Sequence, residues 1–268
     1  MIDLAHYQGI GQFGRAYGVM LERDAHASGS VDRVLAEQMI RLCAETADYL
    51  YADYSPTKVE YVPNSRPALD RVVRDALLDC YEDETRIEAI ARFCAAMGRR
   101  APSGLDALRL GGTEEQILER GSDWCTDVAR VGCVLAQIAG YPARLVNLFD
   151  LDKAYSGHVI VEVFREGAWG AVDATTGVVY RHPISRPATT WELMAFPRLI
   201  AENAEETHGF YTRVGQFSAA GIVNYPVADQ ARYDYTISAP NDTLRAILAE
   251  SSRGWPGGLR WLFGEGEA

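Results

Sequence analysis

The chain has 268 residues, of which 48% are hydrophobic and 24% are charged, as in an ordinary globular protein. Its net charge of −11 argues against binding to nucleic acid or to anionic lipid, because phosphate groups bind basic surfaces. The length is sufficient for a sizeable core and no Pro-, Ser- or Gly-rich linker divides the sequence, so we expect a single domain over residues 1–268.

The N-terminus has no basic stretch followed by an apolar one, and no apolar run reaches the roughly 18 residues of a membrane-spanning helix. Helical periodicity then dominates the first 120 residues. Apolar side chains recur at helical spacing in three stretches: residues 30–54, with Ser30 as N-cap, 67–81 and 83–98. A fourth helix is predicted between Thr113, which forms a capping box with Gln116, and Gly121.

The next predicted helix carries a cysteine in its first turn. Its apolar stripe consists of Trp124, Val128, Val131, Leu135 and Ile138, and Gly140 ends it. Ser122 or Asp123 is the expected N-cap, which places Cys125 among the unpaired N–H groups of the first turn. The helix dipole favours negative charge at that end, so the position suits a thiolate nucleophile.

Strand patterns begin after residue 140. Three strands are predicted over residues 143–149, 158–164 and 168–174, with a further one at 176–180. Residues 189–206 return to helical periodicity, and the mixed segment 209–268 contains a short helix at 241–251 and an apolar tail. The fold class is therefore α+β, a helical N-terminal half packed on a small antiparallel sheet.

A predicted hairpin brings a histidine and an aspartate together. If residues 166–167 form the two-residue turn, Arg165 pairs with Ala168. In that register His158 and Asp173 become diagonal neighbours on one face of the sheet, within reach of each other. A shift by one residue would place them on opposite faces.

The two faces of the strand at 158–164 differ in character. Its three valines share one face, which we expect to lie in the core, and His158 shares the other face with Glu162. We expect the helix end that carries Cys125 to dock on the histidine face, which would complete a nucleophile, base and orienter. A salt bridge with Arg144 is the expected role of Glu162.

The remaining cysteines follow no binding pattern. The five cysteines are odd in number, widely spaced and contain no C-x-x-C pair, which argues against a disulfide framework and a structural zinc site. Cys43, Cys80 and Cys94 fall on apolar stripes and are expected in the core. This usage favours a reduced, cytoplasmic compartment.

The combination resembles the transglutaminase-like superfamily of papain-fold enzymes over about residues 70–180. The resemblance rests on Cys125 at a helix start, "GYPAR" at 140–144, "GHVIVEV" at 157–163, and "AWGAVDATTG" at 168–177 with Trp169 four residues before Asp173. It implies that Cys125 is the nucleophile, His158 the acid and base, and Asp173 the orienter. Ile160 and Ala174 depart from the family, which commonly has an aromatic residue and a proline there.

The resemblance implies a cysteine-dependent acyl-transfer enzyme, a peptidase, an amidase or an acyltransferase, that needs no cofactor or metal. A thiolate would attack an amide or ester, and the acyl group would pass to water or to an amine. The substrate would be a small molecule, a peptide or a tethered acyl group, with no nucleic acid or membrane as partner.

Two other functions are considered. The chain could be a non-catalytic binding scaffold, although a scaffold need not retain all three groups. It could also be a redox sensor, but Cys133 lies eight residues beyond Cys125 on the same helix, about 12 Å along the axis and too far to pair. The N-terminal and C-terminal extensions contain apolar periodicity, and we expect both to pack on the catalytic core and to form walls of its cleft.

Overall fold

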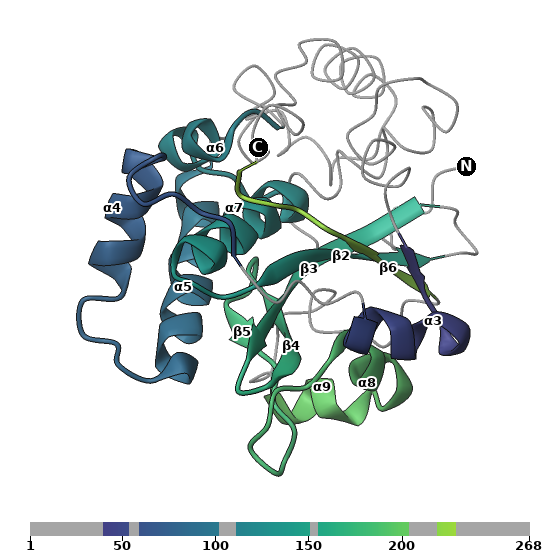
Figure 1. Ribbon diagram of the computed structural model, residues 1–268. Helices are drawn as coiled ribbons and strands as arrows, with labels where there is room; N and C mark the ends of the chain where they lie inside the picture. Colours follow the sequence, from purple (N-terminus) through teal and green to yellow (C-terminus); the bar gives the residue numbers. More distant parts are fainter. Residues whose placement is uncertain (1–39, 54–58, 102–110, 151–154, 204–218, 229–268) are drawn as a thin grey trace, which may run out of the picture.

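The computed structural model describes residues 40–53, 59–101, 111–150, 155–203 and 219–228, to which all structural statements below refer. In this part of the chain a six-stranded antiparallel sheet lies between two groups of helices (Figure 1), with the strand order β1-β6-β2-β3-β4-β5. The strands are β1 (Ile40–Leu42), β2 (Ala143–Asp150), β3 (Tyr155–Arg165), β4 (Ala168–Asp173), β5 (Val178–Val179) and β6 (Ala219–Val223). The predicted α+β class is confirmed.

The helices divide between the two faces of the sheet. The first group consists of α4 (Pro67–Ala76), α5 (Asp83–Met97), α6 (Glu114–Arg120) and α7 (Cys125–Ile138), with the 3₁₀ turn η3 (Gly98–Arg100). The second group consists of α3 (Ala44–Asp48), the π-helix η2 (Tyr49–Asp53), α8 (Thr190–Ala195) and α9 (Arg198–Asn203). The first group packs on the valines of β3 in the larger core, and the second packs on Ile160 in a smaller one.

Helix α7 is the central element of the larger core. Every residue from Cys125 to Gln137 is buried, because α7 contacts α4, α5 and α6 as well as the sheet. The single apolar stripe predicted for this helix is therefore too narrow. A Cβ at Gly132 would lie 3.1 Å from that of Ala174, so glycine permits the close approach of α7 to the sheet.

The hairpin between β3 and β4 has the predicted register. Glu166 and Gly167 both have positive φ, 54° and 76°, as a type I′ turn requires. Arg165 pairs with Ala168, and the ladder continues to Val161 opposite Val172. The twist of this turn matches that of the strands, so a short polar pair fixes which residues of β3 and β4 share a face.

The helix predicted over residues 30–54 is wrong at its centre. Residues 40–42 form β1, which pairs with β6, so partnership in the sheet overrides the helical spacing. Cys43, expected in the core, is instead the half-buried N-cap residue of α3. Cys94 is fully buried as predicted, whereas Cys80 lies beyond the end of α4 and is half-buried.

The second half of the chain agrees more closely. The helix predicted over 189–206 is interrupted at Pro197, which cannot donate a backbone hydrogen bond, and gives α8 and α9. Strand β5 covers only part of the predicted 176–180. The expected helix at 241–251 and the apolar tail lie outside the described residues.

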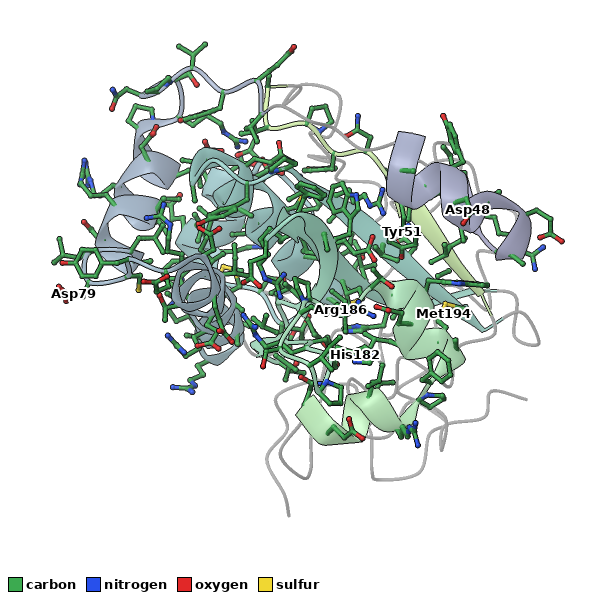
Figure 2. The ribbon with its side chains drawn as sticks, turned by 60° about the horizontal axis from the view of Figure 1, so that its bottom comes forward. Asp48, Tyr51, Asp79, His182, Arg186 and Met194 are labelled. Atoms are coloured by element: carbon green, nitrogen blue, oxygen red, sulfur yellow. The ribbon has the colours of Figure 1, made fainter. Side chains whose placement is uncertain are left out.

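A buried polar cluster joins the second group of helices to the sheet. Arg144 Nε donates to Glu162 at 2.9 Å, which confirms the predicted salt bridge, and the guanidinium lies 3.9 Å from the centre of the Trp169 ring. Tyr51 of η2 donates to Glu162 at 2.8 Å and accepts from the Trp191 N–H at 3.2 Å, so it lies beside α8 (Figure 2). These contacts fix the strand that carries His158.

Candidate active site

Cys125 is the first residue of α7. The N-cap is Trp124, with φ −76° and ψ 121°, and its side chain caps no backbone group, so the prediction of Ser122 or Asp123 as N-cap is wrong. The Ser122 hydroxyl instead accepts from the Trp124 N–H at 3.2 Å and donates to Asp127 at 3.1 Å. The first-turn N–H groups, which have no partner inside a helix, therefore begin at Cys125 without an N-cap side chain.

His158 and Asp173 form the predicted pair. The distance between His158 Nε2 and Asp173 Oδ2 is 2.9 Å, and both side chains are fully buried. Asp173 Oδ1 accepts from the backbone N–H groups of Thr175 at 3.0 Å and Thr176 at 3.3 Å. The carboxylate is therefore held by the turn after β4, and it fixes the imidazole ring in turn.

The geometry of α7 brings Cys125 to the level of His158. Gln137, near the end of α7, donates to the carbonyl of Ala143, whose partner in β3 is Val163, so α7 and β3 run in the same direction. Gly132 lies against Val161. From that contact Cys125 is seven residues back along the helix and His158 three residues back along the strand, about 10 Å in each case.

Helix α7 packs on the valine face of β3, not on the histidine face predicted for it. Cys125 belongs to the same core cluster as the valines. The register of β2 and β3 shifts between Leu148 and Phe149, immediately beside His158, the partner of Leu148. Sequence alternation alone does not reveal such an irregularity.

The pKa of His158 is set by its burial and by its neighbours Asp173 and Cys125. Burial alone would lower the pKa of His158, but the charge and hydrogen bond of Asp173, and then the hydrogen bond and charge of Cys125, raise it to about 10. The raised pKa therefore favours a protonated imidazole beside the Asp173 carboxylate. A histidine next to a cysteine can serve as the base and acid that a cysteine nucleophile requires.

Sequence reasoning missed a second buried cluster at the same end of α7. Asp127 is fully buried and accepts from Gly111 N–H at 3.1 Å, Arg120 at 2.6 Å and Ser122 at 3.1 Å, and Arg130 lies 3.7 Å away. Burial raises the pKa of Asp127, and these charges and hydrogen bonds oppose the shift. The three-residue spacing of Asp127 and Arg130 on one helix face was the available signal.

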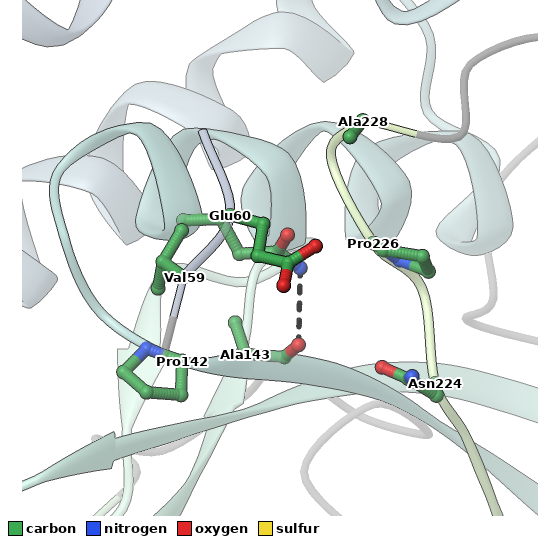
Figure 3. Close-up of a pocket in the computed structure, with 8 residues that line it drawn as sticks. Val59, Glu60, Pro142, Ala143, Asn224, Pro226 and Ala228 are labelled. Atoms are coloured by element: carbon green, nitrogen blue, oxygen red, sulfur yellow. Dashed lines mark hydrogen bonds between the residues drawn. The ribbon is translucent and has the colours of Figure 1, made fainter. Parts of the chain in front are cut away.

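A cavity of about 180 Å³ lies at the other end of α7 (Figure 3). It is bordered by Glu60, Pro142, Asn224 and Pro226, and by Gln137. Gln137 is twelve residues from Cys125, about 18 Å along the helix, so this cavity is separate from the cysteine.

Neither a metal site nor a membrane helix occurs in the described part of the chain. No group of three or more His, Cys, Asp or Glu side chains there is placed to hold a metal ion. None of the described helices has the length and apolar character needed to cross a membrane.

Comparison with known protein families gives one match. Residues 82–174 match the model of the transglutaminase-like superfamily. This segment is a transglutaminase-like core. The match contains Cys125 and His158 and ends directly after Asp173, within the range predicted from the sequence. No curated protein and no solved structure gave a significant match.

The transglutaminase-like core accommodates its two departures by packing. Ile160 is fully buried in the smaller core, and Ala174 is buried against Gly132 of α7. Both side chains are apolar, so neither supplies a reactive group to the candidate site. Members of the transglutaminase-like superfamily are in general cysteine-dependent acyltransferases or peptidases, and some are not catalytic.

Proposed function

We propose that this protein is a cysteine-dependent acyl-transfer enzyme. Cys125 is the nucleophile, His158 the general acid and base, and Asp173 the residue that orients the imidazole. The observation that carries the proposal is the buried His158–Asp173 pair at 2.9 Å, which lies at the level of Cys125 in the first turn of α7. A structural cysteine needs no buried ion pair beside it.

The chemistry follows from these positions. The Cys125 thiolate attacks the carbonyl carbon of an amide or ester, and the Cys125 N–H binds the oxyanion that forms. The His158 imidazolium gives its proton to the leaving amine or alcohol as the carbon–nitrogen or carbon–oxygen bond breaks, which leaves a thioester on Cys125. Neutral His158 then removes a proton from water or an acceptor amine, whose attack releases the acyl group and the thiolate.

Burial restricts the substrate. Cys125 is 9% exposed, and His158 and Asp173 are not exposed at all. This supports a slender acyl donor: a small molecule, a peptide or a tethered acyl group. We further propose that the reaction involves no nucleic acid, membrane or cofactor. All five thiols are free, which supports a reducing cytoplasmic compartment.

The two non-enzymatic alternatives are less well supported. A binding scaffold has no use for a histidine held charged beside a cysteine. A redox sensor would need a second accessible thiol, but Cys133 is fully buried, and burial raises the pKa of its thiol.

Acylation by p-nitrophenyl acetate tests the proposal. We expect a burst of p-nitrophenolate equal to the enzyme concentration, with the acetyl group found on Cys125 by peptide mapping. The Cys125→Ala variant should show no burst, and Cys133→Ala should keep it. Absence of the burst in the parent protein, or an acetyl group on another cysteine, would remove the proposed function.

A further inference from the structure

The buried carboxylate of Asp127 fixes the loop that precedes Cys125. Asp127 accepts hydrogen bonds from Gly111, which precedes α6, from Arg120 at the end of α6, and from Ser122 in the loop between α6 and α7. Arg120 also donates to the carbonyl of Gly111 at 2.7 Å. Three segments that precede the cysteine in sequence are thus fixed to the first turn of the helix that carries it.

Two hydrogen bonds of Ser122 connect Asp127 to the backbone of Trp124, the residue before the cysteine. Ser122 donates its hydroxyl proton to Asp127 Oδ2, which leaves the hydroxyl oxygen to accept the N–H of Trp124. The Trp124 carbonyl meanwhile accepts from Val128 at 3.0 Å, the first hydrogen bond of α7. Both sides of Trp124 are therefore fixed, and so is the peptide plane that contains the Cys125 N–H.

The same arrangement selects which donor is offered to a substrate. The Trp124 N–H is occupied by Ser122, whereas Cys125 supplies the first N–H of the helix. In α6 and α8 the N-cap threonine accepts a first-turn N–H, but the N-cap side chain of α7 does not. A first turn whose N–H groups are not capped by the N-cap side chain suits an oxyanion.

Two arginines compensate the negative charge of the Asp127 carboxylate, which lies close in sequence to the proposed Cys125 thiolate. Asp127 lies two residues from Cys125, and its negative charge alone would oppose a thiolate there. Arg120 and Arg130 lie 2.6 Å and 3.7 Å from its oxygens and compensate that charge. Arg130 is in turn held by Glu114 and by the Tyr225 hydroxyl.

We infer that Asp127 and Ser122 are positioning residues for the oxyanion site: they fix the Trp124–Cys125 peptide so that the Cys125 N–H meets the substrate oxyanion. The inference rests on the proposed nucleophilic role of Cys125. It assigns Asp127 and Ser122 to carbonyl chemistry and not to activation of the thiol, which belongs to His158.

Two probes separate these roles. Acylation of Cys125 by p-nitrophenyl acetate passes through an oxyanion, whereas alkylation by iodoacetamide displaces iodide and needs only the thiolate. In Ser122→Ala we expect acylation to slow about 10-fold while alkylation of Cys125 stays within about two-fold of the parent. Asp127→Asn should slow acylation about 100-fold, with thermal melting measured to establish that it folds.

Glu115→Gln is the matched control. Glu115 binds Arg66 and is not part of the hydrogen-bond network of Asp127 and Ser122 described above, so both rates should stay at the parent values. His158→Gln should slow both reactions.

Ser122→Ala decides the inference, because it removes one hydroxyl and no charge. If acylation is unchanged in this variant, if both rates fall in parallel, or if Glu115→Gln slows acylation equally, the positioning role is wrong while the nucleophilic role stands. If the parent protein is not acylated at Cys125, the proposed function itself fails, which is a distinct result.

Discussion

At the scale of single residues, burial and partners decide which thiol can react. Cys94 and Cys133 are fully buried, and burial raises the pKa of the Cys94 thiol to about 12 and also that of Cys133. The half-buried Cys43 and Cys80 interact with a threonine hydroxyl and a backbone carbonyl, not with a base. Cys125 combines some exposure with a charged histidine.

Asp173→Asn should lower the acylation rate by at least about 100-fold, far more than it lowers the stability of the fold. Asparagine keeps an oxygen for the N–H groups of Thr175 and Thr176, so the turn survives. It removes the charge that raises the pKa of His158. Stopped-flow acylation and a thermal melt measure the two effects, and a rate within a few-fold of the parent would exclude Asp173 from the proposed triad.

The pKa of His158 predicts a pH dependence of stability. The folded-state value of about 10 lies above the ordinary value of 6.5, so folding favours the protonated form. The stabilisation is complete below about pH 6.5 and is lost as the pH rises through about 10. Urea unfolding between pH 6 and 10.5 should show the parent losing stability relative to His158→Gln. Parallel curves for the two proteins would contradict a raised pKa.

At the scale of elements, the site depends on how α7 crosses β3. Gly132→Val would place methyl groups against Ala174 and Val161, where a Cβ alone already lies 3.1 Å from its neighbour. We expect a loss of about 1–3 kcal/mol in the free energy of unfolding and slower alkylation of Cys125 as the helix moves. Gly98→Ala is the control, because its Cβ has an ordinary 3.6 Å contact. Equal stability of Gly132→Val and the parent would show that the approach is not tight.

The same elements show what sequence could and could not predict. Residues 166–167 carry their own turn preference, so the register that pairs His158 with Asp173 followed from local chemistry. Strand β1 depends on a partner, β6, almost 180 residues away in the chain, which no local spacing reveals. The docking of α7 on the valine face of β3 is accompanied by its packing against α4, α5 and α6, and the hydrogen bonds of Asp127 join segments that meet only in the folded protein.

At the scale of the whole molecule, segments outside the matched region complete the sheet. Strand β6, which follows α9 in the sequence, lies between β1 and β2. It therefore pairs directly with β2, a strand of the matched region. Removing β6 would expose the edge of β2 and the apolar side chain of Val146, whose partner in β6 is Ile222. We therefore expect the core to depend on chain beyond the matched residues.

Limited proteolysis tests this dependence. We expect no stable fragment near residues 65–185 to accumulate from native protein, because such a fragment lacks both β1 and β6. The intact protein should also digest unfolded casein slowly, because its nucleophile is largely buried. Clean release of that fragment in folded form, or rapid casein digestion, would contradict this view of the molecule.

The central claim is that Cys125 is a nucleophile activated by His158, and site-resolved alkylation tests it most directly. Native protein is treated with iodoacetamide at neutral pH, and the modification of all five cysteines is followed over time by peptide mass spectrometry. We predict that Cys125 reacts at least about 10-fold faster than each of the others and that His158→Gln abolishes this preference. Faster modification of Cys43, Cys80 or Cys133, or a Cys125 rate unchanged in His158→Gln, would contradict it.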